Sequence, residues 1–375
     1  MMASLAVRNL FHDKVRLAVT LTGIIFAVVL VAVQTGLFIG FTATTSNVID
    51  NSGADLWIMS KGVKYIEVGK PFSEKQYYHA RAVPGVADVQ KSIVRFGQWK
   101  HPDGSDKNCE LIGVDPESRL GGPWALVEGS VSSLKLPDTV IIDRFYAEKL
   151  GAAHLGDTVE IRNIRARVVG FTRGIRTFTT SPLVFTSLKN AEHYASLPDN
   201  QQVYLLVKVT PGADVEAVRR ALLSSLRNVD VFTTAEFSAK TTNYWMFSTG
   251  AGITVIMAAV LGLLVGVVVV AQTIYAATID HIREFGTLKA MGATNRYIYR
   301  IILQQAAISA VIGYGVGIVI ASAVAASSRN GGANILLPGA VRAGLFGLTV
   351  LMCMSAAMVS INKVTRIDPA MVFKG

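Results

Sequence analysis

The stretch REFGTLKAMGATNRYIYR, residues 283–300, is a charged, amphipathic segment that lies between two long apolar runs. Both runs, 252–275 and 301–325, exceed the roughly 20 residues that a helix needs to cross a bilayer. The spacing within the segment predicts a short helix with one apolar side, ended by a glycine suited to a helix C-terminus. The residues that support this prediction are Phe285, Leu288, Lys289, Met291 and Gly292. We therefore expect a compact segment at one membrane face that another protein can bind.

Composition places the chain among membrane proteins. Of its 375 residues, 51% are hydrophobic and only 17% are charged, and the mean hydropathy is +0.42. Four apolar runs without an acidic side chain are predicted to span the membrane. They are residues 17–41, 252–275, 301–325 and 341–361. Arg342 lies at the edge of the last run, where its side chain can reach the interface.

The Lys and Arg residues of the short segments predict the orientation of the chain. Ten of them lie in the N-terminal segment 1–16, the central segment 276–300 and the tail 362–375, whereas the connection 326–340 carries only Arg329. Because cytoplasmic flanks are rich in positive residues, both termini and the central segment are predicted to be cytoplasmic. Segment 1–16 is amphipathic, and the apolar run after it is too long for a cleavable signal sequence.

The net charge of +10 does not indicate a nucleic-acid-binding protein. The insert 42–248 contains 24 basic and 22 acidic residues, and the three predicted cytoplasmic segments contain 10 basic and 4 acidic residues. Much of the excess therefore lies beside the membrane, where it sets orientation, and nucleic acid is not an expected partner.

The insert 42–248 consists of short β-rich runs separated by turn signals. The predicted strands are residues 54–59, 92–99, 110–114, 139–142, 158–161, 166–171, 183–185 and 203–209. The predicted helices are residues 73–82, 144–150 and 214–227. A boundary at 121–123 favours two lobes, one from 47–115 with 200–245 and one from 116–199. Tyr244, Trp245 and Phe247 are expected to form an aromatic belt at the membrane interface.

These patterns together predict the fold class. The chain is expected to be an α-helical membrane protein with four transmembrane helices. A large mixed α+β extracytoplasmic domain is inserted between helices 1 and 2, and a short extracytoplasmic loop, 326–340, joins helices 3 and 4.

No pattern of a catalytic or metal site occurs in the sequence. The six histidines form no HExxH and no ligand-spaced cluster, and there is no GxSxG nucleophile motif. The loop 62–71 lacks both the spacing and the hydroxyl residue of a phosphate-binding loop. Cys109 lies in the insert and Cys353 in the last span, so the two cannot meet on this topology. We therefore expect no enzymatic activity and no cofactor in this chain.

Pairs of glycines at a spacing of four residues occur in three of the four predicted spans. This spacing lets helix backbones approach closely in lipid, either within one bundle or between two copies of the chain. The predicted packing residues are Gly36 with Gly40, Gly262 with Gly266, and Gly313 with Gly317.

The chain has one span, then a large outer domain, then three further spans. This arrangement resembles the permease subunits of the MacB and FtsX-like (type VII) superfamily of ABC transporters. Within that superfamily the DevC group is the most similar. The resemblance covers nearly the whole chain. The stretches that carry it are LAVRNLFHDKVRLAVTLTGI at the start, KLPDTVIID at 135–143, DVEAVRRALLSSL at 214–226, NYW at 243–245, EFGTLKAMGATNRYI at 284–298 and the tail RIDPAMVFKG.

The resemblance implies a homodimer in the inner membrane that works with a separate cytoplasmic ABC ATPase, which binds ATP and Mg²⁺. It also implies a HlyD-type periplasmic adaptor, a TolC-type outer-membrane channel and export by mechanotransmission, with membrane lipids around the spans. A lipid or lipid-linked substrate is favoured, while peptides, drugs and siderophore-like molecules stay open. The implied ATPase-coupling residues are Glu284, Phe285, Gly286, Leu288, Lys289, Met291 and Gly292.

Two other functions stay open at this point. One is an FtsX-like signalling subunit that regulates an extracytoplasmic hydrolase and transports nothing. The other is a passive receptor without an ATPase. Copurifying partners distinguish the three: an adaptor and channel indicate export, a hydrolase indicates signalling, and the absence of a nucleotide-dependent partner indicates a receptor.

Overall fold

The computed structural model describes residues 14–178, 181–198, 200–280, 282–328 and 334–365. The chain divides into two compact units: a helical unit, Met1–Gly40 with Gly252–Gly375, and a mixed unit, Phe41–Ala251. Most of the predicted cytoplasmic segments 1–16 and 362–375 lies outside the described residues.

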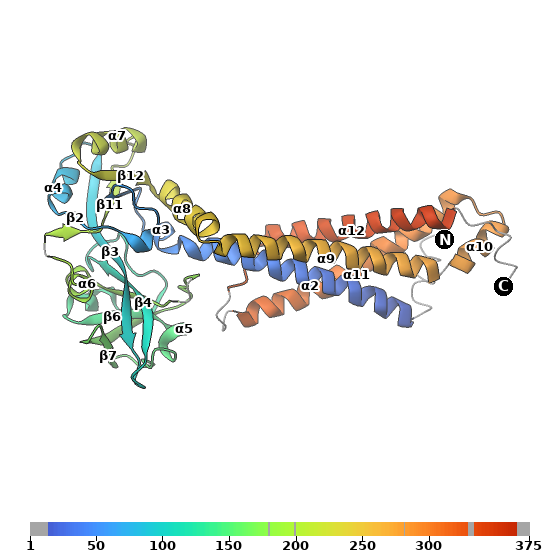
Figure 1. The fold of residues 1–375 in the computed structure, drawn as a ribbon, viewed down its shortest axis with the longest axis horizontal. Helices are drawn as coiled ribbons and strands as arrows, with labels where there is room; N and C mark the ends of the chain where they lie inside the picture. Colours follow the sequence, from blue (N-terminus) through green and yellow to red (C-terminus); the bar gives the residue numbers. More distant parts are fainter. Residues whose placement is uncertain (1–13, 179–180, 199, 281, 329–333, 366–375) are drawn as a thin grey trace. The chain divides into compact units, whose positions relative to one another are not determined.

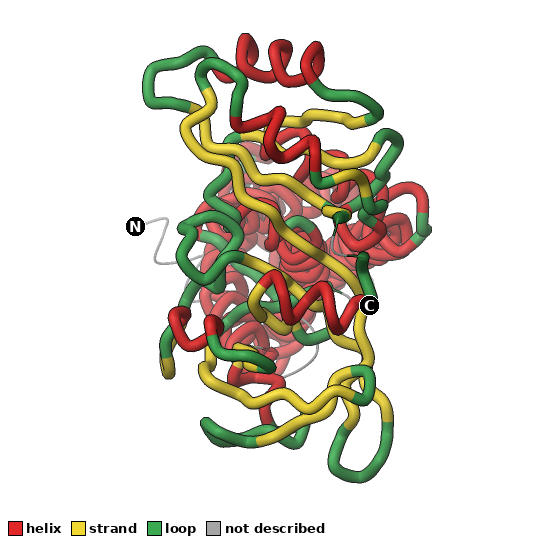
Figure 2. The backbone as a smooth tube through the Cα atoms, turned by 90° about the vertical axis from the view of Figure 1, so that its left-hand side faces the viewer, coloured by secondary structure: helices red, strands yellow, loops and turns green. Residues whose placement is uncertain are grey.

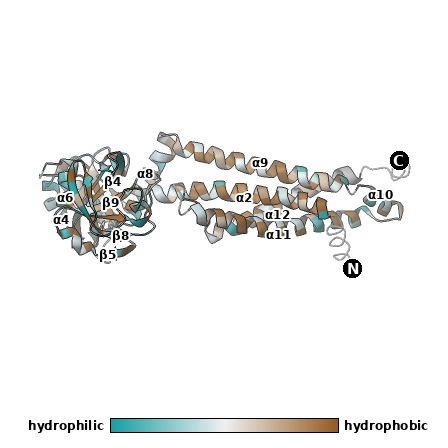
Figure 3. Cartoon of the chain, turned by 90° about the horizontal axis from the view of Figure 1, so that it is seen from below, coloured by the Kyte–Doolittle hydropathy of each residue, from teal (hydrophilic) through white to brown (hydrophobic). Residues whose placement is uncertain are grey.

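The helical unit has, among the described residues, four helices long and apolar enough to cross a membrane (Figure 3). Each contains one of the four predicted apolar runs. They are α2 (Lys14–Thr45), α9 (Ala251–Asp280), α11 (Asn295–Ser328) and α12 (Gly339–Thr365). The short helix α10 (Ile282–Ala290) joins α9 to α11.

Apolar side chains from all four long helices form the core of this unit. Ile24 of α2, Val270 of α9, Ala310 of α11 and Ala357 of α12 are at most 1% exposed. The outward sides are equally apolar, as Val319 at 68% exposure illustrates. Such surfaces are stable against lipid tails, which are as apolar as the side chains themselves.

The mixed unit is built on one ten-stranded sheet with the order β12-β1-β11-β3-β4-β9-β6-β8-β5, in which β7 pairs with β3 and β8 (Figure 2). Most pairs are antiparallel, while β4 with β9 and β6 with β8 are parallel. A separate pair joins β2 (Phe72–Ser73) to β10 (Gln201–Gln202). The strands of the large sheet are β1 (Leu56–Ser60), β3 (Val86–Lys100), β4 (Asp106–Val114), β5 (Leu126–Gly129), β6 (Thr139–Asp143), β7 (Thr158–Ile161), β8 (Ile164–Thr172), β9 (Leu183–Ser187), β11 (Tyr204–Val209) and β12 (Val229–Thr233).

Short helices pack around this sheet (Figure 1). The α-helices are α3 (Asn47–Asp50), α4 (Lys75–Arg81), α5 (Arg144–Ala147), α6 (Leu188–Ala195), α7 (Val215–Ser225) and α8 (Thr234–Asn243). Two 3-10 helices, η1 (Ile66–Val68) and η2 (Val131–Lys135), and the π-helix η3 (Tyr244–Ser248) complete the unit.

The two predicted lobes share this sheet. The long strand β3 pairs with β11 through its first part, where Ser92 faces Tyr204, and with β4 through its second part, where Ile93 faces Gly113. Strand β4 in turn pairs with β9 of the middle lobe. Backbone hydrogen bonds of this sheet therefore join the first predicted lobe, 47–115 with 200–245, to the second, 116–199.

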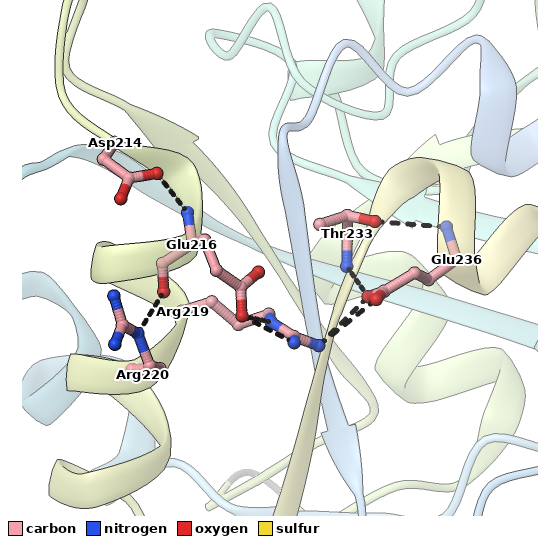
Figure 4. A network of polar contacts seen from close by, with 6 residues as sticks. All are labelled: Asp214, Glu216, Arg219, Arg220, Thr233 and Glu236. Atoms are coloured by element: carbon pink, nitrogen blue, oxygen red, sulfur yellow. Dashed lines mark hydrogen bonds and ion pairs between the residues drawn. The ribbon is translucent and has the colours of Figure 1, made fainter.

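An ion-pair network connects α7 and α8 (Figure 4). Arg219 of α7 lies 2.7 Å from a Glu216 carboxylate oxygen and 3.1 Å from Glu236 of α8. Thr233 and Glu236 form a capping box, in which the Thr233 side chain accepts from the Glu236 N–H and Glu236 accepts from the Thr233 N–H. Because the network is partly exposed, it fixes the orientation of the helices more than it adds stability.

The structure confirms the predicted fold class of four candidate membrane helices with a mixed α+β domain after the first. It also has elements that the sequence patterns did not predict, among them α6, α8 and β12. Helix α8 buries only Phe237 and Thr241, so its apolar periodicity is weak.

Candidate coupling site

Helix α10 lies in the segment predicted to bind a partner. Its C-terminal end is closed by Gly292, which has φ +92°. The Gly292 N–H donates to the Lys289 carbonyl and the Ala293 N–H donates to the Leu288 carbonyl, both at 3.0 Å. This pair of bonds is the Schellman arrangement, which fixes how the chain leaves a helix and favours glycine at this position.

The side chains of this segment divide between the bundle and the solvent. Leu288 is partly buried and packs against the core of the helical unit, and Gly286 is buried. Met291 is 71% exposed, and Glu284 is also exposed. Lys289 is half-buried. The side chain of Phe285 lies outside the described residues, so its part in the predicted apolar side stays a prediction.

This division changes the predicted contact surface. Leu288 packs partly against the bundle core, while the apolar group presented outward in the described part of this turn is Met291. Methionine is flexible and polarizable, which suits a contact that adapts to a partner. The geometry therefore provides a short helix that is anchored on one side and offers an exposed methionine on the other.

The six predicted packing glycines all lie at close contacts inside the helical unit. A Cβ at Gly313 would lie 2.5 Å from Ile24 of α2, one at Gly317 would lie 2.8 Å from Val28, and one at Gly266 would lie 3.1 Å from Val31. Gly262 faces Gln34 in the same way. Gly36 and Gly40 approach the segment before α12. The Leu336 N–H of this segment donates to the Gly36 carbonyl. Asn334 leaves no room for a Cβ at Gly40.

The stretch KLPDTVIID holds a buried structural carboxylate. Asp143 is 1% exposed and accepts hydrogen bonds from the Phe145 N–H at 3.0 Å, the Thr172 hydroxyl at 3.0 Å and the Ile175 N–H at 2.8 Å. These bonds cap α5 and attach the loop after β8 to β6. Asp143 therefore stabilises the domain, and its acceptor capacity is used internally.

Two of the three residues predicted to form an interfacial belt, Tyr244 and Trp245, make contacts within the mixed unit. The Tyr244 ring stacks on Tyr65 with 4.1 Å between the centroids, and the Trp245 indole N–H donates to Glu67 at 3.4 Å. Phe247 is 61% exposed. Tyr244 and Trp245 thus pack against η1 within the mixed unit.

Sequence reasoning missed a pair of buried acids beside this contact. Glu67 is 6% exposed and Glu110 is 3% exposed. Glutamates are rarely buried without a basic partner, and no local sequence pattern distinguishes these two from surface acids. Among the described residues, no group of three or more His, Cys, Asp or Glu side chains is placed to hold a metal ion.

A groove of about 1080 Å³ lies on the mixed unit. Its lining includes Gln90 and Lys91 of β3 from the first predicted lobe and Lys135 and Asn190 from the second. Acidic and basic side chains are mixed along it, so its charge does not select one class of ligand.

Family models match both units. The MacB-like periplasmic core domain matches residues 17–224, and the FtsX-like permease C-terminal domain matches residues 256–369. An uncharacterized ABC transporter permease of Mycobacterium tuberculosis (strain H37Rv) is 26% identical over 396 residues, which cover 99% of each chain. An uncharacterized ABC transporter permease of Mycobacterium bovis is 24% identical over 378 residues, again covering 99% of each chain.

Solved structures resemble the mixed unit at low sequence identity. The periplasmic region of MacB from Actinobacillus actinomycetemcomitans matches with a TM-score of 0.39 and 11% identity, over 52% of this chain and 96% of that one. The extracellular domain of the ABC-type transporter YknZ from Gram-positive bacteria matches with a TM-score of 0.35 and 16% identity, over 48% and 98%.

Both units are thus matched in the expected order, and the model of the MacB-like periplasmic core domain alone covers more than half of the chain. Membership of the DevC group stays a prediction. The chain belongs to the MacB and FtsX-like superfamily of ABC transporter permeases and is a multi-pass protein of the inner membrane.

Proposed function

We propose that this chain is the membrane subunit of an ATP-driven exporter, and that a separate cytoplasmic ATPase acts on α10. The observation that carries the proposal is the structure of α10 itself. Leu288 packs into the bundle core, the Gly292 turn is fixed by two backbone hydrogen bonds, and Met291 is exposed. A force applied at the exposed side is therefore transmitted to the long helices.

In this mechanism the ATPase binds ATP and Mg²⁺, and this chain supplies the moving parts. Two copies of the permease form the transporter, with both termini and α10 in the cytoplasm. Closure of the ATPase dimer displaces α10, and α9 and α11 carry the displacement across the bilayer. The chain runs from α9 back through η3 into the mixed unit, so a shift of α9 acts on that unit through the covalent connection.

The described part of the bundle core supports the substrate class that we propose. The buried polar residues there are uncharged, and include Thr278, Ser309, Thr349 and Ser360. Charged side chains within a membrane usually mark a polar pathway. We therefore favour a lipid or lipid-linked substrate taken up outside the membrane core. Extrusion through a HlyD-type adaptor and a TolC-type channel is part of the proposal because the resemblance to the DevC group implies both partners.

The proposal is tested by Met291→Asp in the full-length protein. A charge at an exposed apolar contact is expected to weaken ATPase copurification at least tenfold, because loss of an interface hot spot costs about 2 kcal/mol or more. Leu136→Asp is the matched control, since Leu136 is 59% exposed but lies on the mixed unit. Equal ATPase copurification with the wild type and both variants would contradict the role of α10.

A further inference from the structure

Glu67 and Glu110 bring two carboxyl groups into the same apolar core. Glu67 lies on η1, between Ile66 and Val68, and Glu110 lies on β4. Their neighbours Ile66, Ile112 and Leu183 belong to one buried cluster. No ion pair joins either carboxyl to a base within the described ranges, and one Glu110 oxygen, Oε1, is buried without a hydrogen-bond partner there.

Burial is the largest cause of each raised pKa among the two carboxyls and the tyrosines around them. Tyr65, beside η1, and Tyr204 of β11 carry hydroxyls whose pKa values are raised first by burial, with the charge of Glu67 contributing to both. Arg95 of β3 opposes the shift of Tyr204. Burial raises the pKa of Glu67 to about 7, and burial together with the charge of Glu67 raises the pKa of Glu110 well above its ordinary value.

The two acids are not equivalent. Glu67 accepts the Trp245 indole N–H, which favours its ionised form and partly offsets burial. Within the part of the chain that the structure describes, Glu110 has no such donor, and it is the more buried of the two. Glu67 is therefore the carboxyl that loses its proton first as pH rises, and its charge then opposes ionisation of Glu110.

Glu67 also touches the segment that leads into the second span. Trp245, its hydrogen-bond partner, lies in the π-helix η3, which ends three residues before α9 begins. The Trp245 ring packs edge-on against Tyr65 at 5.2 Å and against Phe178 at 4.5 Å. Single π-helical turns are rare and occur often at functional sites.

We propose that Glu67, with Glu110 beside it, is a proton-binding site whose loss of a proton releases η3 from η1. Because burial is the largest cause that acts on Glu67 and outweighs both the hydrogen bond from its own backbone and the Trp245 bond, the ionised carboxylate gains more from water than it keeps from these two bonds. The protonated form therefore holds Trp245 and Tyr244 against η1, and the ionised form favours their separation. Under the proposed orientation, the site responds to the pH outside the cytoplasm.

Hydrogen exchange of the purified full-length protein tests this inference without the ATPase. Protection of the 244–248 amides, corrected for intrinsic exchange, is expected to fall about tenfold between pH 6 and pH 8 with a midpoint near pH 7, as one linked proton requires. Glu67→Gln, which resembles the protonated form, is expected to keep high protection at both pH values. Helix α7 serves as an internal reference and is expected to show no such change.

Two further variants show which carboxyl carries the effect. Glu110→Gln is expected to keep the midpoint, because Glu67 is the carboxyl that loses its proton first. Glu148→Gln, at an exposed position, is the matched control. Three results would each overturn the proposal. Glu67→Gln could keep the pH dependence of the wild type, Glu110→Gln alone could lose that pH dependence, or the wild type could show the same protection at both pH values. Failure of the ATPase interaction would leave these results unaffected.

Discussion

Single residues determine how closely the helices of this protein pack. Gly313 and Gly317 of α11 face Ile24 and Val28 of α2, whereas Gly315 between them has no atom within 4 Å of where a Cβ would lie. The spacing of four in the sequence predicts which glycines share a side of the helix, but not the partner. The structure places that partner within the same chain.

Gly313→Ala is expected to lower the thermal midpoint of the detergent-solubilised protein by a few degrees. Its Cβ would lie 2.5 Å from Ile24, and overpacking of this kind costs about 1–3 kcal/mol. Gly315→Ala is the control on the same helix and is expected to keep or slightly raise the midpoint, because alanine favours helix. Equal midpoints for the two variants would show that the contact with α2 does not constrain α11.

The buried acids illustrate what sequence patterns cannot predict at the residue scale. Glu67 and Glu110 lie 43 positions apart, and their proximity depends on η1 and β4 meeting in one core. Asp143, in contrast, lies within a stretch that the family resemblance singled out, although its three hydrogen-bond donors were not predictable.

At the scale of elements, the long membrane-spanning helices were predictable from the sequence, whereas some short helices and strands were not. A run of about 20 or more apolar residues is a strong signal for a spanning helix. Each of the four predicted runs accordingly lies inside one long helix, α2, α9, α11 or α12. Helix α8 has little apolar periodicity, but its capping box of Thr233 and Glu236 is visible in the sequence and would have marked its start. Among the described strands, β12 pairs with β1 alone, more than 150 residues away, and local patterns do not report such pairing.

Helix α10 shows the same limit within the candidate site. The sequence predicts the helix and its terminal glycine, whereas the side that faces the bundle depends on tertiary packing. Leu288 and Met291 are both apolar, yet Met291 is highly exposed and Leu288 is partly buried. The exposed residue is therefore the better position for a test of partner binding.

Gly292→Ala tests the turn that ends α10. A side chain at φ +92° is strained, and the cost of about 1–2 kcal/mol is expected to loosen the Schellman turn. We expect the Kd of the purified ATPase for the nanodisc-embedded permease to rise severalfold. Gly344→Ala in α12, where a Cβ meets no atom within 4 Å, is the control, and an unchanged Kd for Gly292→Ala would refute a role of the turn.

At the scale of the whole molecule, the chain supplies membrane helices and an outer domain, and the proposed motor is a separate polypeptide. Both family models agree with this division, since neither describes a nucleotide-binding domain. The proposed coupling depends on one contact between the exposed end of α10 and that motor.

Cross-linking through a cysteine at Met291 in intact membranes tests this contact most directly. Cys109 and Cys353 are both buried, so Met291→Cys provides the accessible thiol among the described residues. A bifunctional thiol reagent is expected to join it to a separate ATPase polypeptide, whereas Leu136→Cys on the mixed unit is expected to give no such product. The absence of an ATPase adduct at Met291, or labelling of this cysteine by an impermeant reagent added from outside the cell, would contradict the account.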